Sequence, residues 1–96
     1  MNKTPETYVD GYGNKNWIFE YGIAICRERL EDIEGRTIVN PGDIVKYYVW
    51  FDKYKDKVRC MIQAKDGNNW NGKKLSMNEG HFLSFFRVFV YNQKRI

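Results

Sequence analysis

Two neighbouring runs of alternating side chains, Ile44–Phe51 and Val58–Lys65, constrain the fold more than any other feature of the sequence. Alternation with a period of two predicts strands with two different faces. One face carries the apolar set Val45, Tyr47, Val49, Phe51, Val58, Cys60, Ile62 and Ala64. The other carries Lys46, Tyr48, Trp50, Asp52, Arg59, Met61, Gln63 and Lys65. With only the tight charged loop Asp52–Lys57 between them, the two runs predict adjacent antiparallel strands with one buried face.

The flanking segments extend this sheet. Residues 17–30 begin with alternating large apolar side chains and predict a strand, Arg36–Asn40 predicts a short strand, and Trp70–Leu75 predicts the last one. Residues 1–16 contain Pro5, Gly11 and Gly13 and predict a flexible arm, in which Tyr8, Val9 and Tyr12 could pack as an edge segment. The expected organisation is this arm followed by one α+β domain over residues 17–96.

One helix is expected at the carboxyl end, from about Asn78 to about Tyr91. Ser76 and Glu79 match a capping box that would begin it. Its apolar stripe contains Phe82, Phe85, Phe86 and Phe89. Because the stripe is wider than one small sheet needs, it predicts a homodimer interface, with an over-buried core helix as the alternative.

The charge of the chain is unevenly distributed. Residues 1–40 carry five basic and seven acidic side chains, whereas residues 41–96 carry eleven basic and five acidic ones. A basic second part favours contact with a polyanion, and a merely solvated basic surface is the alternative. Cys26 and Cys60 have no metal-ligand spacing and predict buried free thiols, so we expect no metal or cofactor. No leader or membrane span is expected, which predicts a soluble intracellular protein in the cytoplasm, the nucleoid or a eukaryotic nucleus.

Rings and basic groups occur together on the polar face of the predicted sheet and in its loops. Exposed rings stack nucleobases without reading sequence, and Lys or Arg beside them neutralise phosphates. The sequence therefore predicts binding of single-stranded DNA, with melted duplex and RNA as further candidates. The candidate contacts are Lys46, Tyr48, Trp50, Lys53, Tyr54, Lys55, Lys57, Arg59, Gln63, Lys65, Trp70, Lys73 and Lys74.

Several of these segments resemble the positive cofactor four family of single-stranded-DNA-binding transcriptional coactivators, which has relatives in bacteria and phages. The segments are Tyr48-Val49-Trp50-Phe51, Lys53-Tyr54-Lys55-Asp56-Lys57-Val58, Met61-Ile62 and Asn71-Gly72-Lys73-Lys74-Leu75-Ser76-Met77. The resemblance implies a curved four-stranded antiparallel sheet followed by one helix, and a two-fold dimer formed through the helices. It also implies a role in transcription, replication or recombination, together with proteins of those processes.

The resemblance further assigns individual positions. Tyr54 aligns with the family's stacking phenylalanine, and Lys55, Lys57 and Lys73 align with family lysines. This sequence departs from the pattern in three places. Gln63 replaces a strand arginine, Asp66 stands near the family's second stacking ring, and the glycine of the basic segment has moved to Gly72.

Two other classes of function compete with this prediction. Catalysis is not expected, because His81 is the sole histidine and Cys60 lies on the inward face, so no nucleophile and base can be paired. A small β-barrel that binds a protein, such as a phage inhibitor of a host factor, remains the alternative. The turn Asn40-Pro41-Gly42-Asp43 leading into a strand is common in such barrels.

Overall fold

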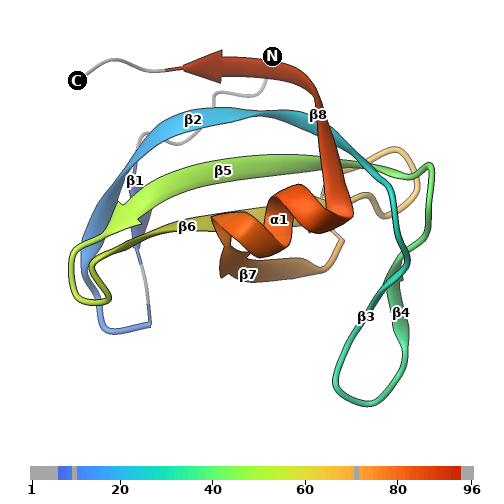
Figure 1. The fold of residues 1–96 in the computed structure, drawn as a ribbon, viewed down its shortest axis with the longest axis horizontal. Helices are drawn as coiled ribbons and strands as arrows, with labels where there is room; N and C mark the ends of the chain where they lie inside the picture. The colour runs from blue at the N-terminus through green and yellow to red at the C-terminus, as the bar shows by residue number, and fades with distance from the viewer. Residues whose placement is uncertain (1–6, 10, 71, 94–96) are drawn as a thin grey trace.

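The computed structural model describes residues 7–9, 11–70 and 72–93, and strands make up most of it (Figure 1). Within these residues, six strands form one sheet in the order β1-β2-β5-β6-β7, and β8 also pairs with β2. A separate hairpin is formed by β3 and β4. The bounds are β1 Thr7–Val9, β2 Lys15–Cys26, β3 Leu30–Glu31, β4 Thr37–Val39, β5 Ile44–Asp52, β6 Lys57–Ala64, β7 Lys74–Asn78, α1 Glu79–Phe85 and β8 Phe86–Gln93.

The two strands predicted from alternation are confirmed as β5 and β6. They pair antiparallel without a register shift from Val45 opposite Ala64 to Asp52 opposite Lys57. The loop between them is held by the Asp52 carboxylate, whose Oδ1 accepts hydrogen bonds from the backbone N–H groups of Tyr54 at 3.0 Å and Lys55 at 3.1 Å. A short polar side chain that satisfies turn amides in this way fixes where the chain reverses.

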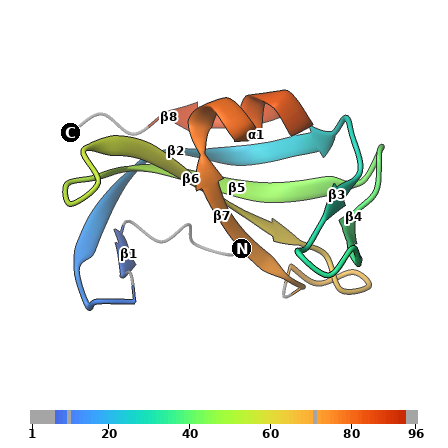
Figure 2. The ribbon, with the colours of Figure 1, turned by 60° about the horizontal axis from the view of Figure 1, so that its bottom comes forward.

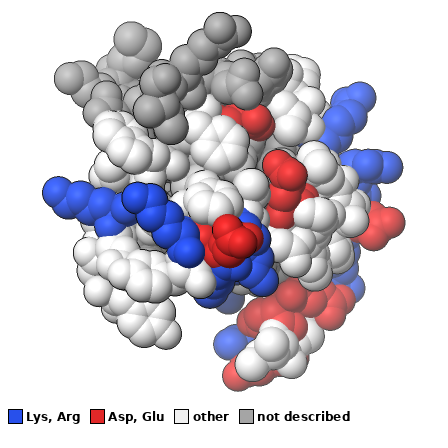
Figure 3. Space-filling view, turned by 60° about the vertical axis from the view of Figure 1, so that its left-hand side comes forward, with Lys and Arg blue, Asp and Glu red and all other residues white. Residues whose placement is uncertain are grey.

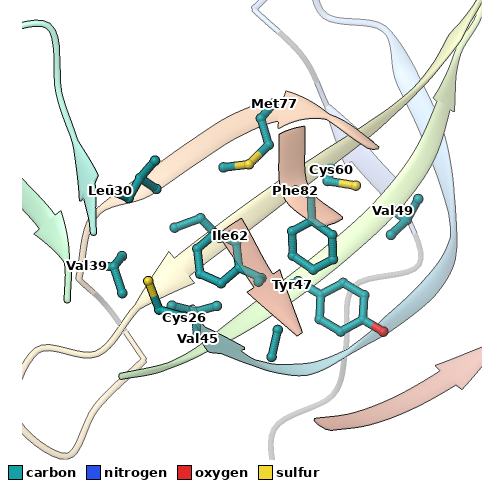
Figure 4. Packing of buried hydrophobic residues seen from close by; sticks show 12 residues of the cluster. Cys26, Leu30, Val39, Val45, Tyr47, Val49, Cys60, Ile62, Met77 and Phe82 are labelled. Carbon is teal, nitrogen blue, oxygen red and sulfur yellow. The ribbon is translucent and has the colours of Figure 1, made fainter. Parts of the chain in front are cut away.

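One face of the sheet is buried beneath α1 (Figure 4). The Phe82 ring lies on the Tyr47 ring with centroids 5.0 Å apart, and Phe86 follows at 5.4 Å from Phe82. The hydroxyl of Tyr47 donates a 2.9 Å hydrogen bond to Glu20, so this buried polar group is satisfied. The remaining buried members of the cluster are Ala24, Cys26, Leu30, Val39, Val45, Val49, Cys60, Ile62 and Met77.

The carboxyl-terminal region differs from the prediction. Asn78, rather than Ser76, caps the helix, with its side-chain oxygen accepting from the His81 N–H at 2.7 Å. The helix ends at Phe85, and the chain continues as β8, antiparallel to β2. Long-range pairing with β2 satisfies the backbone there, and the β-branched Val88 and Val90 suit a strand better than a helical turn.

The prediction that the helical phenylalanines form a dimer surface is wrong for two of them. Phe82 and Phe86 are 2% and 1% exposed and belong to the core of the single chain. Phe85 packs against that core and is partly buried, whereas Phe89 lies in β8 and is 64% exposed. The alternative that the sequence left open, a core helix, holds for Phe82 of α1, and Phe86 is equally buried as the first residue of β8.

The α+β class is confirmed, but the sheet has more strands than the four expected. Tyr8 and Val9 form an edge segment, β1, which pairs with residues 15–17 of β2. Residues 1–6 and 10 of the expected arm lie outside the described residues. The register of β2 against β5 shifts between Ile18 and Glu20. The first part of β2 curves away from the sheet there, so that β1 lies below the sheet on the same side as β7 (Figure 2). No helix in the described part of the chain is long and apolar enough to cross a membrane.

The core role of Phe82 gives a first testable prediction. Phe82→Ala should lower the free energy of unfolding by about 3–5 kcal/mol, because it leaves a cavity against Tyr47. Leu83→Ala, at the neighbouring and exposed position of α1, should cost about 0.5 kcal/mol or less. Urea unfolding followed by circular dichroism measures both, and equal losses would contradict the assignment of the core.

Candidate functional site

The second face of the sheet carries the polar set that the alternation predicted. Three cross-strand pairs lie on it: Lys46 opposite Gln63, Tyr48 opposite Met61, and Trp50 opposite Arg59. On β7, Lys74, Ser76 and Asn78 continue these three rows next to Gln63, Met61 and Arg59. Because residues directly opposite in an antiparallel pair share a face, these side chains leave the sheet on the side away from α1, except that of Asn78, which caps α1.

Two of the predicted stacking rings on this face are covered. Trp50 is only 2% exposed, because the Tyr8 ring of β1 lies over it with centroids 4.3 Å apart and the planes tilted by 41°. Tyr48 is also buried, and burial raises the pKa of its phenol. The expectation that both present free rings to a ligand is therefore wrong: contact with β1, which local alternation does not encode, removes Trp50 from solvent.

The folding of β1 towards β7 leaves an open cavity of about 500 Å³ on this face. A second cavity of about 260 Å³ adjoins it at Tyr8 and Ser76, which line both. We call the two together the β1–β7 groove. Its lining consists of Thr7, Tyr8, Val9, Gly11, Tyr12, Ile18, Trp50, Asp52, Tyr54, Lys55, Arg59, Met61, Lys74, Leu75 and Ser76.

One end of the groove combines exposed rings with basic groups. Tyr54 is 77% exposed, and its hydroxyl donates a 3.1 Å hydrogen bond to Asn14 Oδ1 in the β1–β2 turn. Lys55 follows it in the loop held by Asp52, and Arg59 reaches across to Ser76 Oγ at 3.4 Å. Since both the loop backbone and the ring are anchored, Tyr54 is presented to a ligand at little cost in ordering.

A second cluster of a ring and basic groups lies at the other end of the same face. The Lys65 and Lys46 ammonium groups lie 4.8 Å and 5.4 Å from the centre of the Trp70 ring, within the range of cation–π attraction. Gln63 stands between Lys46 and Lys74 in the strand register. The predicted residues Lys46, Gln63, Lys65 and Trp70 are thus brought together, outside the groove itself.

The remaining predicted lysines are placed less uniformly. Lys53 and Lys57 are exposed beside Tyr54 in the β5–β6 segment. Lys73 instead turns to the β3–β4 hairpin, where its ammonium lies 3.7 Å from Asp32. Hydrogen bonds from the Arg36 and Glu34 backbones hold the pKa of Asp32 below its usual value, so it stays ionised beside Lys73. Among the described residues on the flank in Figure 3, basic side chains alternate with uncharged and acidic surface and form no single continuous patch.

The sequence indicated only a possible edge segment at Tyr8, Val9 and Tyr12, with no role in binding. Tyr8 and Tyr12 both line the groove, and the Tyr8 ring also covers Trp50. The signal available was the short apolar run before a turn with Gly11 and Gly13, which is typical of a hairpin. Gly13 has a φ of 83°, a conformation in which glycine is favoured.

The thiols of Cys26 and Cys60 are buried in the core, and His81 lies on the surface. Burial raises the pKa of the Cys60 thiol to about 12, and burial also raises that of Cys26, whose thiol donates to the Glu28 carbonyl at 2.8 Å. Both stay protonated near neutral pH and are poor nucleophiles. His81 stacks on Phe85 with ring centroids 5.1 Å apart. Within the described residues, no three His, Cys, Asp or Glu side chains group as metal ligands would.

Comparison with known proteins adds no relative. A scan against protein-family models, a search of curated proteins and a search of solved structures each found no match. The similarity to the positive cofactor four family is therefore a resemblance of short motifs alone. The function has to be inferred from the groove and its side chains.

The different burial of the two rings gives a second prediction. Trp50→Ala should destabilise the protein by about 3–5 kcal/mol, since it removes a buried ring and the support of Tyr8. Tyr54→Ala should cost less than about 1 kcal/mol, because it removes only an exposed ring and one exposed hydrogen bond. Thermal and urea unfolding of the two variants distinguish the positions. A Trp50→Ala protein as stable as the wild type would contradict the packing of β1 over the sheet.

Proposed function

We propose that the protein binds single-stranded nucleic acid, without strong sequence preference, along the β1–β7 groove. The observation that carries the proposal is the composition of the groove. Tyrosine rings from the two turns, Tyr12 and Tyr54, lie at one end together with Lys55 and Arg59, and Lys74 lines the other part. Nonspecific single-strand binding uses this combination of stacking platforms and backbone-tracking cations.

Stacking and charge contribute separately. Each base stacked on an exposed ring contributes about 1–3 kcal/mol, and any base has a face that can stack. Duplex bases are already stacked on each other, so rings in a groove favour a single strand. If Lys55, Arg59 and Lys74 each contact one phosphate, the logarithm of the binding constant should fall with the logarithm of salt concentration with a slope of about −2.

The second cluster extends the same surface. Lys46, Lys65 and Trp70 lie on the polar face at the opposite end of β5 and β6 from Tyr54, so a strand leaving the groove along β6 would meet them. By resemblance to the positive cofactor four family, we propose a role in transcription, replication or recombination. The proposal does not include the helix-mediated dimer that the resemblance implied, because Phe82 and Phe86 are buried in the core of the single chain.

A protein-binding module is the second candidate, and one observation favours it. Both rims of the groove are strands, β1 and β7, that pair on one side only among the described elements. An extended peptide could add to either rim by backbone hydrogen bonds. The exposed Lys55 and Lys74 and the partly buried Arg59 of the groove are better explained by phosphates, and for that reason nucleic acid is the first candidate.

Fluorescence anisotropy with labelled oligo-dT and with its duplex tests the proposal. The wild type should bind the single strand more tightly than the duplex, and the affinity should fall with added salt. Tyr54→Ala and Arg59→Ala should each weaken binding about tenfold, equivalent to about 1.4 kcal/mol.

The matched controls lie away from the groove. Phe51→Ala changes a partly exposed ring of β5, and Arg27→Ala changes an exposed arginine beyond the end of β2. Both should bind like the wild type. Absence of oligo-dT binding at low salt, or equal losses in the control variants, would refute the nucleic-acid function and leave the peptide-binding candidate.

A further inference from the structure

Strand β8 forms an edge of the sheet whose outer side is open. It runs antiparallel to β2 from Cys26 opposite Phe86 to Glu20 opposite Gln93. No other described strand pairs with it. In Figure 1, β8 lies along the outside of the sheet above β2. Among the described residues, its outward backbone donors and acceptors have no strand partner, and such an edge can pair with another strand.

The three strands at the ends of the sheet differ in how they are protected. Natural proteins keep edge strands from pairing by making them short or by placing lysine on them. β1 has three residues, and β7 has five and begins with Lys74. β8 has eight residues with the sequence FRVFVYNQ, in which Arg87 is the single charge and neither proline nor glycine occurs. Of these strands β8 is the longest, and its protection is limited to Arg87 and a bulge near its middle.

An exposed ring accompanies this open edge. The register of β8 against β2 shifts between the pair Val88–Ala24 and the pair Val90–Ile23, so Phe89 is the extra residue of a bulge. Val88 packs against the core, whereas Phe89 is 64% exposed. A bulge re-aims the side chain it carries, and here it leaves most of a phenylalanine ring in solvent, where that exposed area gains nothing from burial in the single chain.

We propose that β8 pairs with β8 of a second copy of this chain, antiparallel, and that Phe89 is buried in that contact. An antiparallel edge is complementary to itself: the same strand, rotated by a two-fold axis, supplies matching donors and acceptors and closes the assembly at two chains. The nearly uncharged sequence removes the like-charge repulsion that would oppose self-pairing. A register centred at Phe89 keeps Arg87 of each chain away from its own counterpart.

This surface lies across β2 from the β7 rim of the groove. In the strand order, β8 lies on the far side of β2 from β5, β6 and β7. Pairing at β8 therefore leaves the β7 rim and the Tyr54 end of the groove uncovered, and one dimer would carry two grooves. The dimer and the binding function can each be right or wrong independently of the other.

Sedimentation velocity over a range of protein concentrations tests the proposal. A contact of one strand edge and one ring per chain is small beside the usual stable interface of about 1,200–2,000 Å², so the wild type should form dimers that dissociate on dilution. Phe89→Lys should raise the dissociation constant at least about tenfold, equivalent to about 1.4 kcal/mol. Phe51→Lys, at a 44% exposed ring of β5, is the matched control and should dimerise like the wild type.

Hydrogen exchange on the wild type gives a second readout that needs no variant. Backbone amides of β8 should become better protected as the protein concentration rises, while those of β7 should not. A wild type that stays monomeric at submillimolar concentration would overturn the proposal. So would equal effects of the two lysine variants, or a dimer whose β8 amides gain no protection.

Discussion

The packing of Phe82 between Tyr47 and Phe86 is the contact on which the rest of the structure depends. It assigns one face of the sheet to the core and closes that face with a helix of only seven residues. The apolar surface of β5, β6 and β7 on that side is thereby removed from water, which is the main favourable term for a domain of this size. The opposite face does not have to form the core, so basic and hydroxylated side chains can lie on it.

The bend of β2 turns this free face into a groove. The register shift after Ile18 lets the first part of β2 carry β1 beneath the sheet, where Tyr8 covers Trp50. A flat sheet would present Trp50 as a stacking surface. The curled one buries Trp50 as the floor and offers the turn residues Tyr12 and Tyr54 instead. The curvature that removes Trp50 from contact with a ligand therefore also creates a concave site in which a ligand can bind.

Local patterns predicted the centre of this fold, and contacts between distant residues decided the rest. The alternation in β5 and β6 placed Tyr47 inward and Lys46 outward correctly, because a strand's two faces follow from its own sequence. The stripe of phenylalanines fitted a helix equally well, but pairing of β8 with β2 ends the helix at Phe85. The basic residues of the candidate site were predicted because they follow from the alternation within each strand. The burial of Trp50 beneath Tyr8 was not predicted, because that contact joins residues far apart in the sequence.

The central claim, that the β1–β7 groove holds a single strand, is tested most directly by a two-dimensional ¹⁵N–¹H titration with a short oligo-dT. The account predicts that the amide resonances that shift lie around the groove, at Tyr54, Lys55, Arg59 and Ser76, and that those of α1 stay in place. Saturable shifts confined to α1 and the β3–β4 hairpin would contradict it. A spectrum unchanged at low salt would remove the nucleic-acid function altogether.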